Sequence, residues 1–283
     1  PSEITADLQL EPIVRITPAI GGQSLFVGDD LGFVEIDGVP PGEYTVHPVF
    51  TDGSSDIEVT VASDQAVENS TSVPRDGIYY YPINTDSDVT QLGDRDVRRA
   101  LGIGISRADL ISAGGGGEPT AYDLMPPSLT SDGISGFNSI TESGTEATDL
   151  LSGTSTFNFE LLHNEDDQHA SIAAEFRSQV EEASEIGSVT VVAKTWDNYR
   201  SDLADGNFDV ARAGWVLDSN NLLNYFEALL GEAGYSDDTT NRLISEAQNA
   251  LNDRDLTTHV DRIVELHDHL IDEMVLIPIF RYE

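Results

Sequence analysis

The apolar pattern of the chain changes near residues 73–77, and this change constrains the fold more than any other feature. Before it, short runs of β-branched or aromatic residues are separated by Gly, Pro and Asp, which is typical of strands and turns. These runs are residues 13–16, 24–27, 33–36, 44–46 and 57–61. We therefore expect residues 1–75 to form a small, β-sandwich-like, all-β domain.

From residue 76 to residue 283 the expected elements alternate between strands and helices, which indicates an α/β domain. Short apolar runs predict strands at residues 78–84, 157–162, 189–193, 208–213 and 275–281. Apolar residues at helical spacing, with Asp or Gly at the ends, predict helices at residues 95–113, 146–151, 166–186, 196–204, 221–230, 238–251 and 255–273. The expected fold class is α/β with a mixed sheet, preceded by the small all-β segment.

The charge of the chain limits both its environment and its partners. It has 14 Lys and Arg residues against 51 Asp and Glu residues, a formal net charge of −37, and Lys194 is its single lysine. Such a chain repels itself in dilute buffer, but at molar salt the Debye length falls to about 3 Å and the repulsion is screened. The composition resembles that of haloarchaeal proteins, with an ordinary acidic protein as the alternative. Nucleic acid is excluded as a partner, because binding phosphates requires clustered Lys and Arg.

Catalytic and metal-binding motifs are missing from the sequence. The absence of cysteine excludes disulfides, zinc–thiolate sites and thiol catalysis. His267 and His269 lie two residues apart and point to different faces of the expected helix, so they do not form a metal-binding pair. Ser106 lies in a degenerate nucleophile-elbow sequence, in which Ala108 replaces the final Gly. We therefore expect no metal, no cofactor and no enzymatic activity.

Residues 206–218 are the most informative segment for function. Arg212 offers a bidentate donor for a carboxylate, and Asp218 offers a partner for an amine. Trp215 supplies an apolar wall, and Gly214 permits another backbone to approach. A peptide zwitterion requires all four properties. The alternative is a core tryptophan with a surface Arg–Asp pair.

This segment closely resembles the oligopeptide-binding proteins of ABC importers, which are extracellular solute-binding proteins of family 5. Further matches keep the order of the family, and they lie at residues 79–84, 94–101, 106–107, 121–127, 157–164, 196 and 275–279. The resemblance covers residues 77–283 and implies the second lobe of a periplasmic-binding-protein-like fold. Family members carry a full first lobe, where this chain has about 75 residues of β pattern. The first domain is therefore either an added module or a remnant of that lobe.

The resemblance implies that a peptide adds to the protein like an extra strand. It implies that Asp218 meets the α-amino group of the peptide, that Arg212 meets a C-terminal carboxylate, and that Gly214 and Trp215 supply backbone and pocket contacts. The expected function is the extracellular peptide-binding component of an ABC transporter, with an oligopeptide as ligand and permease subunits as partners. The alternative is a cell-surface or filament subunit built on a vestigial lobe, which would form a homo-oligomer or surface assembly.

Two further expectations concern the location of the protein. No run approaches the roughly 20 apolar residues of a membrane-spanning helix, so we expect attachment to the cell surface through a segment outside this sequence. Asn69 begins an Asn-x-Ser/Thr triplet in a polar linker and is a glycosylation candidate, although such triplets also arise by chance.

Overall fold

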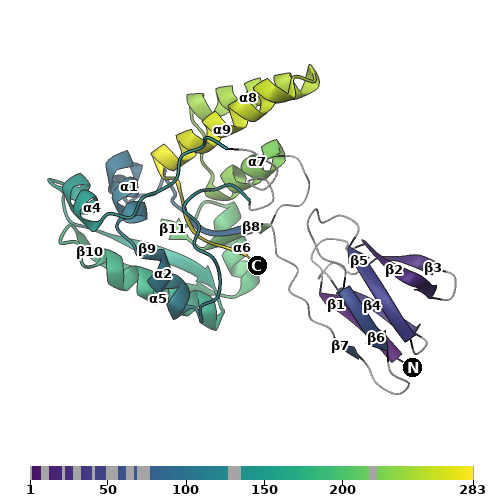
Figure 1. Cartoon of the computed structure of the whole chain (residues 1–283). Coiled ribbons are helices and arrows are strands. Elements are labelled where there is room, and N and C mark those ends of the chain that lie inside the picture. Colours follow the sequence, from purple (N-terminus) through teal and green to yellow (C-terminus); the bar gives the residue numbers. More distant parts are fainter. Residues whose placement is uncertain are drawn as a thin grey trace. The chain divides into compact units, whose positions relative to one another are not determined.

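A computed structural model describes residues 2–7, 13–20, 23–27, 33–39, 42–48, 57–61, 67–68, 77–126, 135–216 and 222–282. In the first 75 residues, side chains are described only at Tyr44 and Thr45. The chain divides into two compact units, Pro1–Arg75 together with Glu283, and Asp76–Tyr282 (Figure 1). Each unit is described by itself below.

The first unit contains two sheets. One has the order β4-β1-β7, in which β1 pairs antiparallel with β4 and parallel with β7. The other has the order β3-β2-β5-β6 and is antiparallel throughout. The strands are β1 (Ser2–Asp7), β2 (Ile13–Ile20), β3 (Gln23–Val27), β4 (Phe33–Val39), β5 (Gly42–Pro48), β6 (Ile57–Val61) and β7 (Val67–Glu68). The five predicted runs all lie within strands, and β1 and β7 are additional.

The second unit also contains two sheets. The sheet β10-β9-β11 is parallel, and the sheet β12-β8-β13 is antiparallel. The strands are β8 (Gly77–Pro82), β9 (Phe157–Asn164), β10 (Ile186–Lys194), β11 (Val210–Ala211), β12 (Ala213–Val216) and β13 (Leu276–Arg281). The predicted α/β fold class with strands of both directions is therefore confirmed.

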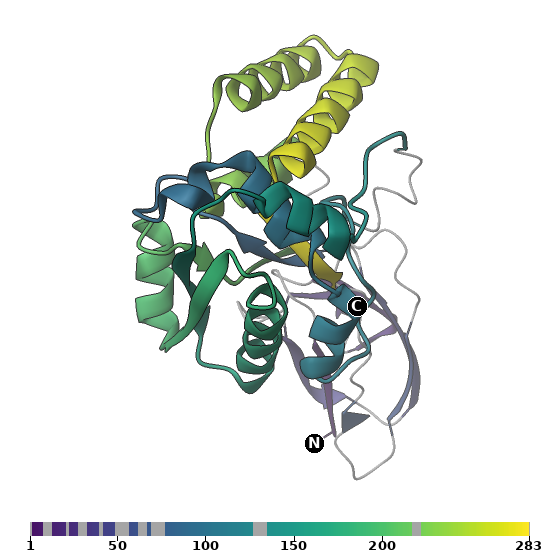
Figure 2. The same cartoon turned by 90° about the vertical axis from the view of Figure 1, so that its left-hand side faces the viewer.

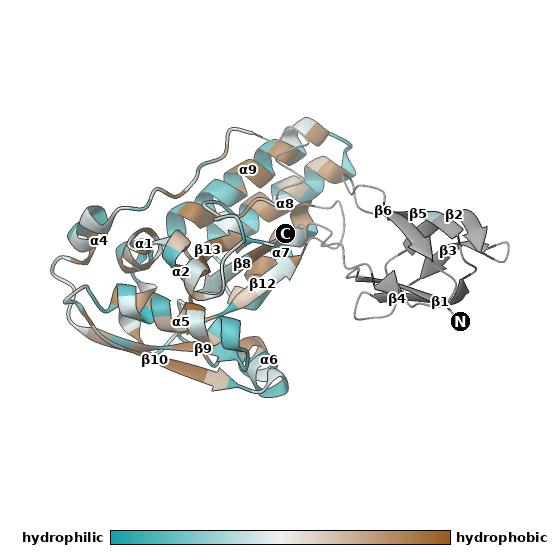
Figure 3. Cartoon of the chain, turned by 60° about the horizontal axis from the view of Figure 1, so that its bottom comes forward, coloured by the Kyte–Doolittle hydropathy of each residue, from teal (hydrophilic) through white to brown (hydrophobic). Residues whose placement is uncertain are grey.

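Helices surround these two sheets (Figure 2). They are α1 (Arg95–Ile103), α2 (Arg107–Ala113), α4 (Gly144–Leu151), α5 (Asp167–Val180), α6 (Trp196–Ala204), α7 (Leu222–Ala233), α8 (Asp238–Asn252) and α9 (Leu256–Glu273), with a short 3-10 helix η1 at Thr90–Gly93. Most begin at a side chain that accepts a hydrogen bond from the first turn, which satisfies backbone donors without a helical partner. These residues are Asp94, Ser106, Ser143, Asp166, Asp237 and Asp255. Helices α8 and α9 alternate hydrophobic and hydrophilic residues, as expected for helices with one buried face (Figure 3).

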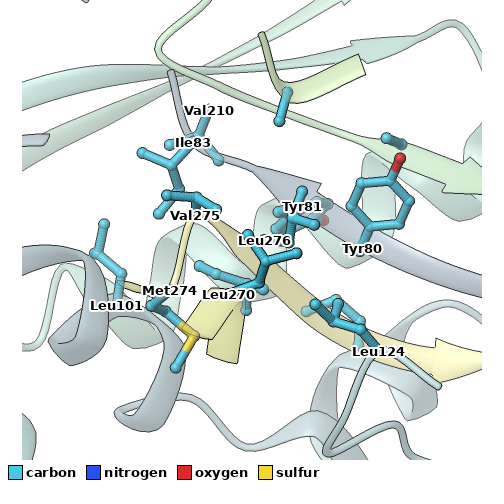
Figure 4. Close-up of a cluster of buried hydrophobic side chains, with 14 of the residues drawn as sticks. Tyr80, Tyr81, Ile83, Leu101, Leu124, Val210, Leu270, Met274, Val275 and Leu276 are labelled. Atoms are coloured by element: carbon cyan, nitrogen blue, oxygen red, sulfur yellow. The ribbon is translucent and has the colours of Figure 1, made fainter. Parts of the chain in front are cut away.

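Strand β8 forms the centre of the main core. All of its residues are buried, and successive side chains point to opposite faces of the sheet. Val275, which follows α9, lies beside Ile83 and accepts a hydrogen bond from its backbone N–H at 2.9 Å, and Leu276 pairs with Pro82 (Figure 4). The ring of Tyr79 stacks on Phe280 of β13, with the ring centroids 4.5 Å apart. Complete burial of side chains of this size contributes about 1.5–3 kcal/mol each to the stability of the fold.

The structure corrects three predicted boundaries. The helix predicted over residues 95–113 is broken: α1 ends at Ile103, and Ser106 adopts an extended conformation and caps α2. The helix predicted over residues 166–186 ends at Val180, because Ile186 already pairs with β9. The strand predicted over residues 208–213 is also divided, and Arg212 separates β11 from β12. The last correction has the largest consequence for the site.

Candidate functional site

Arg212 lies where the chain passes from one sheet to the other. It follows β11, which pairs with β9, and it precedes β12, which pairs with β8. Its backbone N–H donates to the carbonyl oxygen of Leu162 at 2.7 Å, and its backbone carbonyl oxygen accepts from the hydroxyl of Tyr199. Both backbone polar groups of this linking residue are therefore held, as a part-buried backbone requires.

The guanidinium of Arg212 contacts polar and aromatic groups but leaves one donor unused. Nη1 donates to Oδ1 of Asn164 at 3.5 Å, and Nη2 donates to the hydroxyl of Tyr282 at 3.3 Å. The guanidinium carbon lies 5.1 Å from the centroid of the Tyr79 ring, within the range of a cation–π interaction. Nε is buried and has no hydrogen-bond partner among the described residues. A buried donor without an acceptor is costly, so the described part of the site leaves this donor available to a further acceptor.

No carboxylate among the described residues forms an ion pair with Arg212, although its charge contributes to lowering the pKa of Asp166. It is the only arginine of the described residues that is not exposed and that forms no ion pair with a carboxylate. Burial by itself lowers the pKa of Arg212, but the neighbouring phenol groups raise it by more. The pKa is therefore above its ordinary value and the guanidinium stays charged. In a chain with 51 acidic residues, an interior cation without a carboxylate is unexpected.

His169 on α5 extends this group of residues. Its ring lies 5.5 Å from the Tyr79 ring, and its Nδ1 is buried without a hydrogen-bond partner among the described residues. Burial and the charge of Arg212 lower the pKa of His169 to about 4, against a smaller opposing effect of Asp166. The imidazole is therefore neutral at pH 7. His169 was not among the residues predicted for the site, although it follows β9 and so lies near the carboxyl end of a parallel strand, where binding sites are common.

Strand β12 brings Gly214 and Trp215 next to Arg212. Gly214 pairs with Tyr79 and Trp215 pairs with Ile78, and among the described strands β12 has β8 as its only neighbour. The indole N–H of Trp215 is buried and has no acceptor among the described residues. Among the described strands β12 is thus an edge strand, with three half-buried residues and a side-chain donor that no described residue uses, and an edge strand can accept a further strand.

Gly214 has a second structural role that the sequence did not suggest. A Cβ at this position would lie 2.0 Å from the hydroxyl oxygen of Tyr282, the same hydroxyl that accepts from Arg212. In this structure the space above Gly214 is therefore taken by a side chain of the same protein. Any larger residue at position 214 would displace Tyr282.

The described structure brings together three of the four predicted ligand-binding residues, Arg212, Gly214 and Trp215. Asp218 lies outside the described residues, and so does the glycosylation candidate Asn69. Within the described part of the chain no group of three or more His, Cys, Asp or Glu side chains is placed to hold a metal ion. No helix among the described residues is long and apolar enough to cross a membrane.

Residues 42–237 match the family described as bacterial extracellular solute-binding proteins, family 5 middle. The chain belongs to this family. Among curated relatives, the oligopeptide-binding protein OppA of Bacillus subtilis is 24% identical over 227 residues, which is 74% of this chain and 41% of the relative. The periplasmic murein peptide-binding protein MppA of Escherichia coli is 31% identical over 162 residues, which is 52% of this chain and 29% of the relative.

Solved structures of family 5 proteins share the fold. The unliganded open form of MppA aligns with a TM-score of 0.63 and 25% identity, over 74% of this chain and 42% of that chain. OppA of Haemophilus influenzae in complex with the peptide RPPGFSPFR aligns with a TM-score of 0.63 and 23% identity, over 74% of this chain and 43% of that chain. The chain spans about two fifths of the length of these relatives. Family 5 relatives are binding proteins rather than enzymes, and the names of several describe them as periplasmic.

Proposed function

We propose that this chain is the extracellular peptide-binding component of an ABC transporter, and that Arg212 binds the carboxylate of its ligand. The observation that carries the proposal is the interior guanidinium of Arg212, which has an unused donor and no counter-charge among the described residues. A carboxylate would supply both the missing acceptor and the missing charge in a bidentate geometry. The peptide-binding relatives support this choice of ligand.

The peptide would lie along β12 as an added strand, a common mode of peptide recognition. Its C-terminal carboxylate would meet Arg212, and its backbone would run past Gly214 with a side chain against Trp215. Asp218, two residues beyond the end of β12, would pair with the α-amino group. Permease subunits are the partners that this function requires, and surface attachment through a segment outside this sequence stays a prediction.

The alternative function, a surface or filament subunit on a vestigial lobe, is not favoured by the comparisons. A vestigial site would have no reason to keep an unpaired interior cation, because replacement by a neutral side chain relieves its desolvation cost. The family relationship also supports a binding protein without catalytic activity.

Calorimetry with matched peptides tests the proposed function directly. A pool of tripeptides and the same pool with C-terminal amides are titrated at molar salt. Since hydrogen bonds to charged groups contribute about 1.5–3 kcal/mol, wild type should prefer the free acid by at least about tenfold. Arg212→Gln should remove this preference. Arg177→Gln is the matched control, because Arg177 is exposed and forms no ion pair among the described residues. Equal affinity of wild type for acid and amide, or no binding of either, would overturn the proposal.

The same assay tests Asp218 through the other end of the ligand. N-terminal acetylation removes the positive charge of the peptide, so it should weaken binding to wild type more than binding to Asp218→Asn. An equal loss in both proteins would show that Asp218 does not contact the α-amino group.

We further propose that the protein is adapted to molar salt and that its second unit corresponds to the second lobe of longer family members. The net charge of −37 supports the first point, and the partial coverage of the relatives supports the second. The family match begins at residue 42, inside the first unit, which favours a remnant of the first lobe over an added module. Thermal unfolding at molar KCl and in dilute buffer tests the salt adaptation, and equal stability in both would contradict it.

A further inference from the structure

Helix α6 contacts the site through a residue outside the predicted ligand-binding set. Tyr199 is 1% exposed and belongs to a small core cluster with Leu162, Leu203 and Phe208. Its hydroxyl donates to the backbone carbonyl oxygen of Arg212. Tyr199 therefore contacts Arg212 at its backbone, and its hydroxyl also helps to raise the pKa of the Arg212 guanidinium. It does so from a helix that begins 16 residues earlier in the chain than Arg212.

This carbonyl belongs to Arg212, the single residue between β11 of the parallel sheet and β12 of the antiparallel sheet. β11 ends at Ala211 and β12 begins at Ala213, so neither sheet has Arg212 within a strand. The N–H of Arg212 is held by β9 through Leu162, which leaves its carbonyl oxygen to a side-chain donor. Tyr199 is that donor. Burial raises the pKa of Tyr199 to about 12, so the hydroxyl keeps its proton at neutral pH.

The side chain of Arg212 depends on this backbone position because its own contacts are weak. The two hydrogen bonds to Asn164 and Tyr282 are 3.5 and 3.3 Å long, near the limit of a useful interaction. No carboxylate among the described residues holds the guanidinium in place. The direction of the guanidinium therefore depends on where the backbone of residue 212 lies, together with the neighbouring rings of Tyr79 and Tyr199.

A second connection holds α6 to the strand that carries Tyr79. Arg200, the next residue of α6, donates to Glu232 of α7 at 2.7 Å, and Glu232 accepts from the hydroxyl of Tyr80 at 2.9 Å. Tyr80 belongs to β8, the partner of β12. Adjacent residues of α6 thus reach both the link between the sheets and the central strand of the second sheet.

We propose that Tyr199 is a positioning residue, which holds the backbone of Arg212 so that the guanidinium meets a ligand carboxylate in bidentate geometry. This inference rests on the proposed function, because it assigns to Tyr199 the selectivity for a free carboxylate. Tyr199 acts on the position of the Arg212 guanidinium. Loss of its hydroxyl should therefore weaken binding of peptides with a free C-terminal carboxylate more than binding of peptides with a C-terminal amide.

The test compares Tyr199→Phe with Tyr225→Phe. Tyr225 lies on a different helix, α7, and is also fully buried. Its hydroxyl also donates to a backbone carbonyl oxygen, that of Leu124, at 3.1 Å. Both variants lose a buried hydrogen bond to a backbone carbonyl oxygen, so both should lose similar thermal stability. Calorimetry with the tripeptide acids and amides at molar salt should show the preference for acid falling roughly fivefold in Tyr199→Phe and staying unchanged in Tyr225→Phe.

A second measurement needs no ligand. The side-chain Nε–H of Arg212 is followed by NMR, and its exchange with solvent should be about tenfold faster in Tyr199→Phe than in wild type or Tyr225→Phe, because local opening exposes it. Unchanged exchange together with an unchanged acid preference would overturn the positioning role while leaving the proposed function intact. If wild type binds no peptide, the proposed function fails, and the exchange rate alone decides whether Tyr199 positions Arg212.

Discussion

Arg107 and Arg212 are both interior arginines beside aromatic rings, yet their surroundings differ in every other respect. The Nε of Arg107 donates to the carbonyl oxygens of Ala121 and Pro278 at 2.9 and 2.8 Å, and its Nη1 reaches Glu142 at 3.3 Å. Its Nη2 donates to the carbonyl oxygen of Gly102 at 3.1 Å, so all three nitrogens are used. Arg212 has two long hydrogen bonds, a free Nε and no carboxylate among the described residues.

The difference separates two uses of a buried guanidinium. Arg107 connects α2 to three other segments of the chain through backbone acceptors, and its charge is balanced by a carboxylate, so it stabilises the fold. Arg212 carries a desolvation cost that no carboxylate among the described residues offsets, and on the proposed function a ligand carboxylate would offset it. The two arginines therefore differ in how many of their donors the described residues use.

The largest expected effect is on stability. Arg107→Gln should lower the free energy of unfolding by about 3 kcal/mol or more, because it leaves several buried carbonyl oxygens without donors. Arg212→Gln should change it by less than about 1 kcal/mol, since only two long hydrogen bonds are lost. Urea unfolding at molar salt measures both. Similar losses in the two variants would remove the basis of the comparison.

The next effect concerns pH and the neighbour of Arg212. His169 has a pKa of about 4 in the folded protein against 6.5 in the unfolded chain, so the unfolded chain binds more protons in this interval. The contribution of neutral His169 to the free energy of unfolding is fully present above about pH 6.5. It is lost as the pH falls towards 4, by at most about 3 kcal/mol. Burial also lowers the pKa of His267, which acts in the same direction. His169→Gln should therefore flatten the pH dependence only in part.

NMR titration connects this prediction to Arg212. In Arg212→Gln the pKa of His169 should rise, because the second-largest cause of its depression is removed. Arg177→Gln should leave it unchanged. A pKa that is the same in all three proteins would show that the charge of Arg212 does not reach the imidazole.

A smaller effect is expected at Gly214. Gly214→Ala places a methyl group on the Tyr282 hydroxyl, which must move away from Arg212, at a cost of about 1–2 kcal/mol. Gly144→Ala is the control, because a Cβ there meets nothing within 4 Å and alanine favours the helix by up to about 1 kcal/mol. Thermal unfolding should therefore show a lower melting temperature for Gly214→Ala than for Gly144→Ala. The opposite order would contradict the close contact between Gly214 and Tyr282.

The smallest effect is expected for a paired arginine near the surface. Arg99 lies 3.3 Å from Asp272 and 3.7 Å from Glu146, both more than half exposed. Arg99→Gln should cost less than about 1 kcal/mol, because exposed ion pairs are screened, above all at molar salt. A loss as large as that of Arg107→Gln would show that ion pairing, rather than buried backbone acceptors, explains the stabilising role of Arg107.

Local signals predicted most of the helices and strands. Helix α6 lies at residues 196–204 as predicted, and α8 and α9 agree with their predicted ranges to within one residue at each end. Their boundaries depend on caps and apolar spacing within a few residues, which the sequence displays directly. The break at Gly104 was missed because the apolar spacing continues across it, while the cap at Ser106 is formed only in the folded chain.

The candidate site was predictable only in part. Arg212, Gly214 and Trp215 were identified because they are adjacent in sequence, and their role in binding stays a prediction. Their neighbours come from distant segments, and adjacency in sequence does not reveal them. Those neighbours are Tyr79, Asn164, His169, Tyr199 and Tyr282.

The sequence by itself determined the α/β fold class, the positions of most elements and the strong negative charge, because these follow from residue type and local spacing. Only the tertiary structure decided that Arg212 links two sheets and lacks a counter-charge among the described residues. The physical reason is that strand pairing and burial act between residues far apart in the chain. The guanidinium of Arg107 has an acceptor for each nitrogen, whereas the Nε of Arg212 has none among the described residues. That difference depends on which distant carbonyl and carboxylate groups the fold brings to each arginine.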